Sequence, residues 1–251
     1  MDVEQAHIRV EGVTLAYGSF VIQQDLTFDI RRGDIYIIMG GSGCGKSTVM
    51  RSLSGLLQPK TGSVYYNGVS FWDTPATERD RMMHNLGVMY QSGALWSSMT
   101  LSENIALPLE LHTGLSTTQA LSVARYKLAL VGLTGFEDFY PSEISGGMQK
   151  RVGVARAMAL DPDILFFDEP SAGLDPLSAR MLDDLILELR DSLGTTMVIV
   201  THELASIFAI ADDCVFLDAE TKTMLTTGNP RELRDHSDIH KVRSFLNRGE
   251  L

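Results

Sequence analysis

The 251-residue sequence is poor in cysteine and carries fewer basic than acidic residues. Its two cysteines, Cys44 and Cys214, do not suggest a disulfide framework, and we therefore expect a reducing compartment. The 21 Lys and Arg against 32 Asp and Glu give a net charge of −11. This balance argues against a nucleic-acid partner, because binding along a polyphosphate requires a basic face. It leaves room for one local basic site.

Long apolar runs are also missing from the sequence. The longest runs, such as residues 164–167, are far shorter than the roughly 20 residues that a helix needs to span a bilayer. No charged and then apolar leader opens the chain, so we expect no signal peptide. Repeats and low-complexity segments are not found. The composition is ordinary for a globular protein of one large or two small domains.

A glycine-rich loop lies between an apolar stretch, residues 35–39, and a helical pattern that starts at residue 49. The loop and its flank read Gly40, Gly41, Ser42, Gly43, Cys44, Gly45, Lys46, Ser47 and Thr48. Strand, glycine loop, Lys-Ser and helix form the phosphate-binding P-loop pattern, in which backbone amides and a helix N-terminus face an anion. Lys46 adds charge at the β- and γ-phosphates, and Ser47 offers a hydroxyl to Mg²⁺. A plain glycine turn is the alternative, and both flanks disfavour it.

The segments around the P-loop predict an α/β domain. Residues 7–16 and 20–30 alternate as two antiparallel strands, and Tyr17 between them either stacks on a base or is a half-buried hairpin aromatic. A strand over residues 86–90 ends at Gln91, which either faces a ligand crevice or is a solvated loop residue. Residues 92–135 are helical in pattern, which predicts an insertion. Further elements are expected at residues 63–68, 77–85, 176–192, 196–200, 215–217 and 222–226.

Two later stretches carry chemistry. Ser145, Gly146 and Gly147 precede a helix predicted over residues 148–160 and leave bare amides for a second phosphate site. The apolar strand at residues 164–167 ends in Asp168 and Glu169. In a P-loop protein Asp168 holds Mg²⁺ and Glu169 aligns and polarises the attacking water. The alternative is an acidic strand terminus without such a role, which the P-loop upstream disfavours.

The last part of the chain adds a histidine and a charged tail. His202 follows the strand at residues 196–200 and can reach a γ-phosphate, or serve as a structural hydrogen-bonding residue. Residues 231–251 predict a helical tail with charges of both signs, which we interpret as a solvated face.

The order of these motifs resembles the ATP-binding subunit of ABC transporters over residues 8 to about 228. The resemblance implies that Tyr17 stacks on adenine, that Gln91 touches Mg²⁺ and relays motion to a membrane subunit, and that His202 is the switch histidine. Ser145, Gly146 and Gly147 match the signature loop, and Asp175 matches the D-loop. Ile144 and Met148 depart from the usual Leu and Gln of that signature and leave its Ser-Gly-Gly intact.

The same resemblance implies the architecture and the cofactors. We expect a P-loop NTPase core with a mostly parallel sheet, an N-terminal antiparallel β subdomain and an inserted helical subdomain, all in one ABC ATPase domain. The core covers about residues 1–91 and 152–228, the helical subdomain about 92–151 and the tail about 229–251. Two subunits pack head to tail, and each ATP with its Mg²⁺ lies between the P-loop of one subunit and the signature loop of the other.

Residues 90–96 and 141–148 look like the ATPase of MCE-type, Mla-like phospholipid transporters. That resemblance implies a homodimer attached through integral-membrane permease subunits to the cytoplasmic face of the inner membrane. An MCE-domain lipid-binding protein lies on the periplasmic side, and in some systems a STAS-domain protein binds the ATPase. The tail is shorter than expected for this branch.

The leading hypothesis is therefore an ATPase that powers lipid transport. The alternatives are the ATPase of an importer for a polar solute, a non-transport ABC protein acting on ribosomes or DNA, and a P-loop kinase. The charge of −11 disfavours nucleic acid, and a kinase would leave the Ser-Gly-Gly loop and Glu169 without a task.

Overall fold

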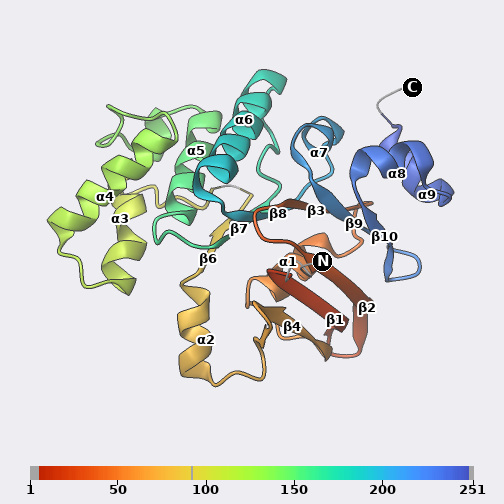
Figure 1. The fold of residues 1–251 in the computed structure, drawn as a ribbon. Helices are drawn as coiled ribbons and strands as arrows, with labels where there is room; N and C mark the ends of the chain where they lie inside the picture. The colour runs from red at the N-terminus through yellow and green to blue at the C-terminus, as the bar shows by residue number, and fades with distance from the viewer. Residues whose placement is uncertain (1–5, 92, 249–251) are drawn as a thin grey trace.

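Two β-sheets form the frame of the molecule (Figure 1). The computed structural model describes residues 6–91 and 93–248, so Ser92 and the last three residues of the predicted tail lie outside the described part. The smaller sheet is antiparallel, in the order β2-β1-β4-β5. Its strands are β1 (Ile8–Tyr17), β2 (Phe20–Ile30), β4 (Thr61–Tyr66) and β5 (Val69–Ser70). This sheet is the predicted antiparallel opening of the chain.

The larger sheet has the order β10-β9-β3-β8-β7-β6. Its strands are β3 (Ile35–Gly40), β6 (Leu86–Met89), β7 (Ile164–Asp168), β8 (Thr196–Val200), β9 (Asp213–Leu217) and β10 (Met224–Gly228). All neighbouring pairs are parallel except β9 and β10, which form the predicted final hairpin. The predicted fold class, a mostly parallel α/β sheet with an antiparallel β subdomain and helical insertions, is confirmed.

Helices cover both faces of the larger sheet (Figure 1). They are α1 (Lys46–Leu53), α2 (Ala76–Met83), α3 (Leu101–His112), α4 (Thr117–Leu130), α5 (Gly146–Ala157), α6 (Pro176–Leu193), α7 (Leu204–Ile210), α8 (Pro230–His236) and α9 (His240–Leu246), with a 3₁₀ turn at Pro141–Glu143. Capping boxes at Thr100 with Glu103 and at Ser116 with Gln119 define where α3 and α4 begin. The segment that the sequence predicted as a helical insertion, residues 92–135, therefore contains two well-capped helices.

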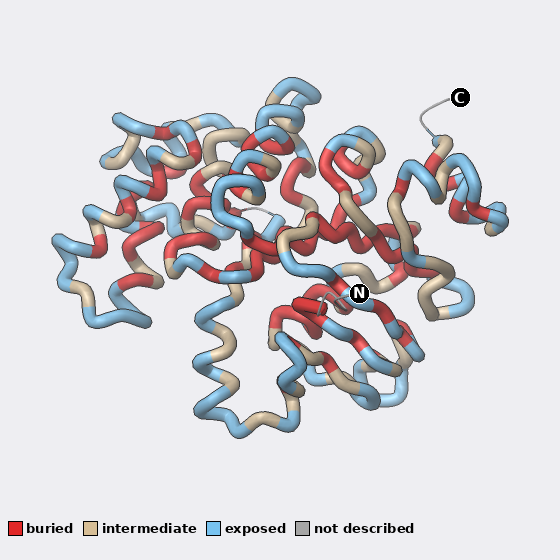
Figure 2. The backbone as a smooth tube through the Cα atoms, viewed as in Figure 1, coloured by how far each residue is buried: buried red, intermediate tan, exposed pale blue. Residues whose placement is uncertain are grey.

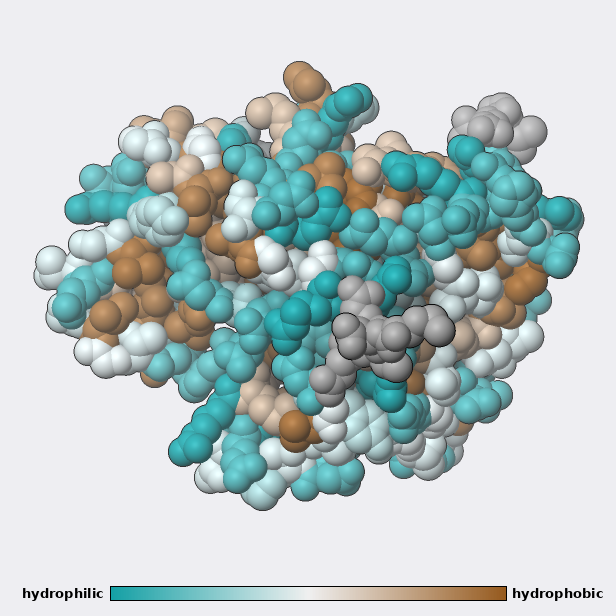
Figure 3. Space-filling model, viewed as in Figure 1, coloured by the Kyte–Doolittle hydropathy of each residue, from teal (hydrophilic) through white to brown (hydrophobic). Residues whose placement is uncertain are grey.

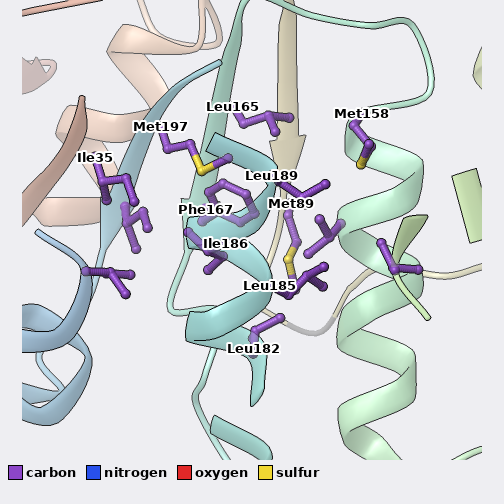
Figure 4. Close-up of a cluster of buried hydrophobic side chains, with 14 of the residues drawn as sticks. Ile35, Met89, Met158, Leu165, Phe167, Leu182, Leu185, Ile186, Leu189 and Met197 are labelled. Atoms are coloured by element: carbon purple, nitrogen blue, oxygen red, sulfur yellow. The ribbon is translucent and has the colours of Figure 1, made fainter. Parts of the chain in front are cut away.

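The core has two parts because successive strand residues point to opposite faces of the sheet. Ile35, Ile37 and Met39 of β3 pack in the cluster with α3 to α6, whereas Tyr36 and Ile38 pack in the cluster with α1 and the smaller sheet. Figure 2 shows the resulting band of buried backbone along the larger sheet. Figure 4 shows α6 contributing side chains to the first cluster beside strand residues: Leu182, Leu185, Ile186, Leu189, Phe167 and Met197.

Hydrophobic residues are unevenly distributed over the surface (Figure 3). On the face drawn in Figure 3, hydrophobic residues gather over α3 and α4, and most of the remaining surface is hydrophilic. Of the helices within residues 6–91 and 93–248, none is both long and apolar enough to cross a membrane.

Three expectations about helices need correction. The helix predicted from residue 148 begins at Gly146, because Ser145 caps it. Helix α7 was not predicted at all; it is only seven residues long. The tail is not merely a solvated face, since Val242, Phe245 and Leu246 are buried. Their i, i+3, i+4 spacing gives α9 an apolar side, which the surrounding charges obscure in the sequence.

Candidate active site

The candidate residues follow the carboxyl ends of parallel strands. In the register of the sheet, Ile38 pairs with Val200 and Phe167 pairs with Ile199, so β3, β7 and β8 end at one edge. The P-loop, Glu169 and His202 come directly after these ends. Ligands in open α/β sheets bind at such an edge, in the crevice outside the carboxyl ends of the strands.

Glycine is required at two points of the P-loop. Gly40 has a φ of +151°, and a Cβ there would lie 2.3 Å from the Leu217 carbonyl oxygen. Gly45, which precedes α1, has a φ of +94°, and its Cβ would lie 2.6 Å from Cγ2 of Ile22. Side chains at these positions would clash and strain the backbone. The sequence therefore folds into a tight cradle whose amides lead into the N-terminus of α1.

A buried glutamine that the sequence analysis missed holds this cradle. Gln23 of β2 is fully buried, and its Nε2 donates to the Cys44 carbonyl at 2.6 Å and to the Asp218 carbonyl at 2.9 Å. Cys44 itself is buried, and burial raises the pKa of its thiol. Cys44 therefore serves the loop through its backbone.

A cavity of about 440 Å³ lies beside the P-loop. Its lining consists of Gly40, Gly41, Ser42, Gly43, Lys46, Glu169, His202, Leu204, Phe245 and Arg248. The Lys46 ammonium donates to the carbonyls of Gly40, at 3.1 Å, and Gly41, at 3.2 Å. These are weak, exchangeable partners, so the ammonium is available for an anion in the cavity.

Ser47 and Asp168 are brought together across the sheet edge. The Ser47 hydroxyl donates to Oδ1 of Asp168 at 3.3 Å. Desolvation raises the pKa of Asp168, the Ser47 hydrogen bond and Lys46 lower it, and Glu169 raises it further. A hydroxyl and a carboxylate are the hard oxygen donors that Mg²⁺ prefers. Among the described residues, no group of three His, Cys, Asp or Glu side chains could hold a metal ion.

Glu169 is held in an unusual conformation next to His202. Its φ is +48°, and its amide donates to the Val200 carbonyl at 2.8 Å. Oε1 lies 2.8 Å from Nδ1 of His202, whereas Oε2 is buried without a hydrogen-bond partner among the described residues. Leaving a buried carboxylate oxygen without a hydrogen bond is costly, so this arrangement is unusual for a purely structural residue. Strained backbone of this kind is common at active sites.

The predicted signature loop and D-loop lie outside this cavity. Ser145 caps α5, with its hydroxyl accepting from the Met148 amide at 3.3 Å, and both Ser145 and Gly146 are exposed. A Cβ on Gly147 would lie 3.5 Å from Cβ of Ser178. Asp175 accepts from the Ser178 hydroxyl and amide, and these bonds lower its pKa. The signature loop therefore lies beside the start of α6 and is open toward solvent.

Tyr17 and Gln91 also lie outside the cavity lining. Tyr17 is 48% exposed at the end of β1, and its hydroxyl is 3.4 Å from a guanidinium nitrogen of Arg51 in α1. Gln91 is exposed, and its carbonyl accepts from the ammonium of Lys150 in α5. Both residues contact helices that follow a predicted phosphate-binding loop, α1 after the P-loop and α5 after Ser145.

Helix α5 holds the segment after β6 at two points. Besides Lys150, Arg156 donates to the carbonyls of Gly93, at 2.7 Å, and Ala94, at 2.6 Å. Burial lowers the pKa of Lys150, and the charge of Glu169 opposes this shift. The sequence analysis did not single out Lys150 or Arg156, although they lie six positions apart on the helix that Ser145 caps.

Comparison with known proteins places this geometry in a family. Residues 23–172, more than half of the chain, match the family model described as ABC transporter. The chain belongs to the ABC transporter family. It is 40% identical over 240 residues to the probable ribonucleotide transport ATP-binding protein Mkl of Mycobacterium leprae, covering 96% of this chain and 68% of that protein. It is 36% identical over 242 residues to the intermembrane phospholipid transport system ATP-binding protein MlaF of Escherichia coli, covering 95% and 88%.

Solved structures agree with this assignment. A dimeric post-hydrolysis state of the ATP-binding cassette MJ0796 bound to ADP and Pi superposes with a TM-score of 0.78 at 27% identity, covering 88% of this chain and 98% of that one. The resemblance to an ABC ATP-binding subunit is thus confirmed, and with it ATPase activity and the ATP and Mg²⁺ that it requires.

Proposed function

We propose that this ABC ATPase powers phospholipid transport between the inner membrane and the cell envelope. The observation that carries the proposal is the 36% identity to E. coli MlaF over 95% of the chain, together with 34% identity to its Haemophilus influenzae counterpart. The predicted importer for a polar solute is retained as the second candidate because the M. leprae relative is named for ribonucleotide transport.

The proposed mechanism assigns a task to each side chain of the site. Bound ATP with Mg²⁺ supplies the phosphoanhydride bond and the divalent charge. Lys46 and the P-loop amides bind the phosphates, and Ser47 with Asp168 holds the metal. Glu169, which lines the cavity, accepts a proton from the attacking water, while His202 fixes the carboxylate through Oε1.

We propose a head-to-tail homodimer as the active form. The exposed Ser145 and Gly146 lie outside the cavity that Lys46 and Glu169 line, so within one chain they do not contact the same nucleotide. A second subunit brings its signature loop to the open side of this cavity, and Asp175 lies beside the contact. The dimeric MJ0796 cassettes support this arrangement.

An apolar groove supports a permease partner. It has a volume of about 680 Å³ and is lined mainly by residues of α2, β6, α3 and α5, among them the 67% exposed Leu111. Arg156 also lines it and bonds the carbonyls of Gly93 and Ala94, just after Gln91. We assign the groove to a short apolar helix of the permease, because an occupant there would touch Arg156 and so move the segment that carries Gln91.

The remaining partners follow from the MlaF relationship. We propose attachment to the cytoplasmic face of the inner membrane through two permease subunits, with an MCE-domain lipid-binding protein on the periplasmic side. A STAS-domain protein is a further candidate partner. None of these contacts requires this chain to touch the lipid.

Affinity purification from native membranes in mild detergent tests the proposal. The tagged protein should recover a permease, an MCE-domain protein and bound phospholipid. Leu111→Glu should abolish that recovery, while the control Leu193→Glu, on an exposed residue at the end of α6, should not. Recovery of a permease with a soluble solute-binding protein, and with neither an MCE-domain protein nor phospholipid, would contradict the lipid function and favour the second candidate.

A further inference from the structure

The C-terminal tail closes one side of the P-loop cavity. Phe245 of α9 and Arg248, just after it, line the cavity together with Lys46, Glu169 and His202. The sequence analysis interpreted this tail as a solvated face, so a role at the nucleotide was not expected. The position of Arg248 is informative only if α9 is fixed relative to the P-loop.

Helix α9 is fixed to β9 by packing and by charge. The Phe245 ring is buried and meets the ring of Phe216 edge to face, with centroids 5.2 Å apart. At the start of the helix, the Lys241 ammonium lies 2.5 Å from Oδ1 of Asp218 and 3.2 Å from Oε2 of Glu220. Burial alone would raise the pKa of Asp218, but the hydrogen bonds from Lys241 and Thr221 bring it down to about 2.

The same aspartate connects the tail to the P-loop. Nε2 of the buried Gln23 donates both to the Asp218 carbonyl and to the Cys44 carbonyl within the P-loop. A short series of contacts therefore links the tail to the P-loop. It consists of the ion pair between Lys241 and Asp218 and the hydrogen bonds from Gln23 to the carbonyls of Asp218 and Cys44. This places Arg248 at a defined position beside the cradle.

The charge of Arg248 has no counterion in the described structure. Its guanidinium stacks over the Phe245 ring at 5.1 Å from the centroid, and no carboxylate among the described residues pairs with it. Stacking on an aromatic ring orients the planar guanidinium and leaves its N–H groups free. A guanidinium binds phosphate oxygens with two parallel hydrogen bonds, which the ammonium of Lys46 does not offer.

We propose that Arg248 is a phosphate-binding residue that the tail supplies to the nucleotide of its own subunit. It contacts the γ-phosphate, because the cavity it lines is the part that also holds Glu169 and His202. The inference deepens the proposed function and rests on the nucleotide site assigned there. Through Arg248, the tail would then help the site to distinguish a nucleoside triphosphate from a diphosphate.

Equilibrium binding of ATP and ADP to the full chain tests this assignment. Arg248→Gln should weaken ATP binding by about tenfold, the scale of one lost charge-assisted hydrogen bond, and ADP binding by less than about threefold. Arg248→Lys should recover part of the ATP affinity. The control Arg243→Gln changes an exposed cation of the same helix outside the cavity lining and should bind both nucleotides like the parent protein.

Three results would overturn the proposal. They are unchanged or tighter ATP binding by Arg248→Gln, equal losses for ATP and ADP, and an equal loss in Arg243→Gln. The thermal unfolding midpoint of each nucleotide-free variant shows whether the tail has kept its packing. Failure of the parent protein to bind ATP would instead refute the nucleotide site itself, so the two failures are distinguishable.

Discussion

His202 and Glu169 form a bonded pair at the edge of the sheet, with Nδ1 of the imidazole 2.8 Å from Oε1 of the carboxylate. The histidine side chain is 61% exposed and the glutamate side chain only 13%. The contact with the imidazole therefore fixes one oxygen of a carboxylate that is largely buried. The other oxygen, Oε2, is buried and has no hydrogen-bond partner among the described residues.

We expect His202→Ala to lower kcat by about tenfold or more, because the Glu169 carboxylate loses the contact that orients it. ATP affinity should change far less than kcat, since the P-loop is untouched. Steady-state kinetics and equilibrium ATP binding measure the two effects. His236→Ala removes an exposed histidine of α8 and serves as the control. A kcat equal to that of the control would rule out the positioning role.

Lys150 is expected to position Gln91 for catalysis. Lys150→Met keeps the length of the side chain and removes the donor to the Gln91 carbonyl, so kcat should fall about tenfold with ATP affinity unchanged. Lys150→Arg keeps a donor and should recover much of the rate. The exposed Lys60→Met is the control. An Arg variant as slow as the Met variant would point to general damage to α5 instead.

The packing of the tail makes a stability prediction. Phe245→Ala removes a buried ring and should destabilise the fold by about 3 kcal/mol. For a domain of this size the unfolding midpoint should then fall by about 6–12 °C. Arg243→Ala, on the exposed side of α9, should leave the midpoint unchanged. If both variants unfold at the parent temperature, α9 does not pack as described.

His7 makes stability depend on pH. Burial lowers its pKa to about 4, helped by Arg32 and opposed by Asp163, and Nδ1 lies 2.6 Å from Oγ1 of Thr196. Because the folded pKa lies below the unfolded value of about 6.5, the stability that His7 contributes is present above pH 6.5 and is lost as the pH falls toward 4.

The loss of stability caused by His7→Gln should therefore be largest near pH 7.5 and smaller at pH 5.5. Chemical denaturation of the parent and variant proteins at both pH values measures this difference. A loss that is equal at the two pH values would show that His7 titrates normally in the folded protein.

Much of this site could be predicted because its motifs are local. The P-loop, the Asp168-Glu169 pair and His202 each follow a short apolar run, and parallel strands bring such ends to one edge. The antiparallel opening was equally clear, since residues 7–16 and 20–30 alternate around a Tyr-Gly-Ser turn. In each case the signal lies within about ten residues of sequence.

The supporting residues could not be found in this way. Gln23 reaches the P-loop from β2, Lys150 and Arg156 reach the segment after β6 from α5, and Arg248 reaches the cavity from the tail. These contacts join distant parts of the chain. Most of them are made to backbone carbonyls, and every residue has a backbone carbonyl, so the residue type does not reveal the contact. A glutamine at a buried strand position was the one available signal.

The central claim, that Glu169 aligns the water for ATP hydrolysis, is tested most directly by Glu169→Gln. This variant should bind ATP and form a stable dimer with ATP bound, while turnover falls by about two orders of magnitude or more, the usual scale for losing a general base. Lys46→Ala should instead weaken ATP binding itself. Near-normal turnover in a Glu169→Gln protein that binds ATP would contradict the account.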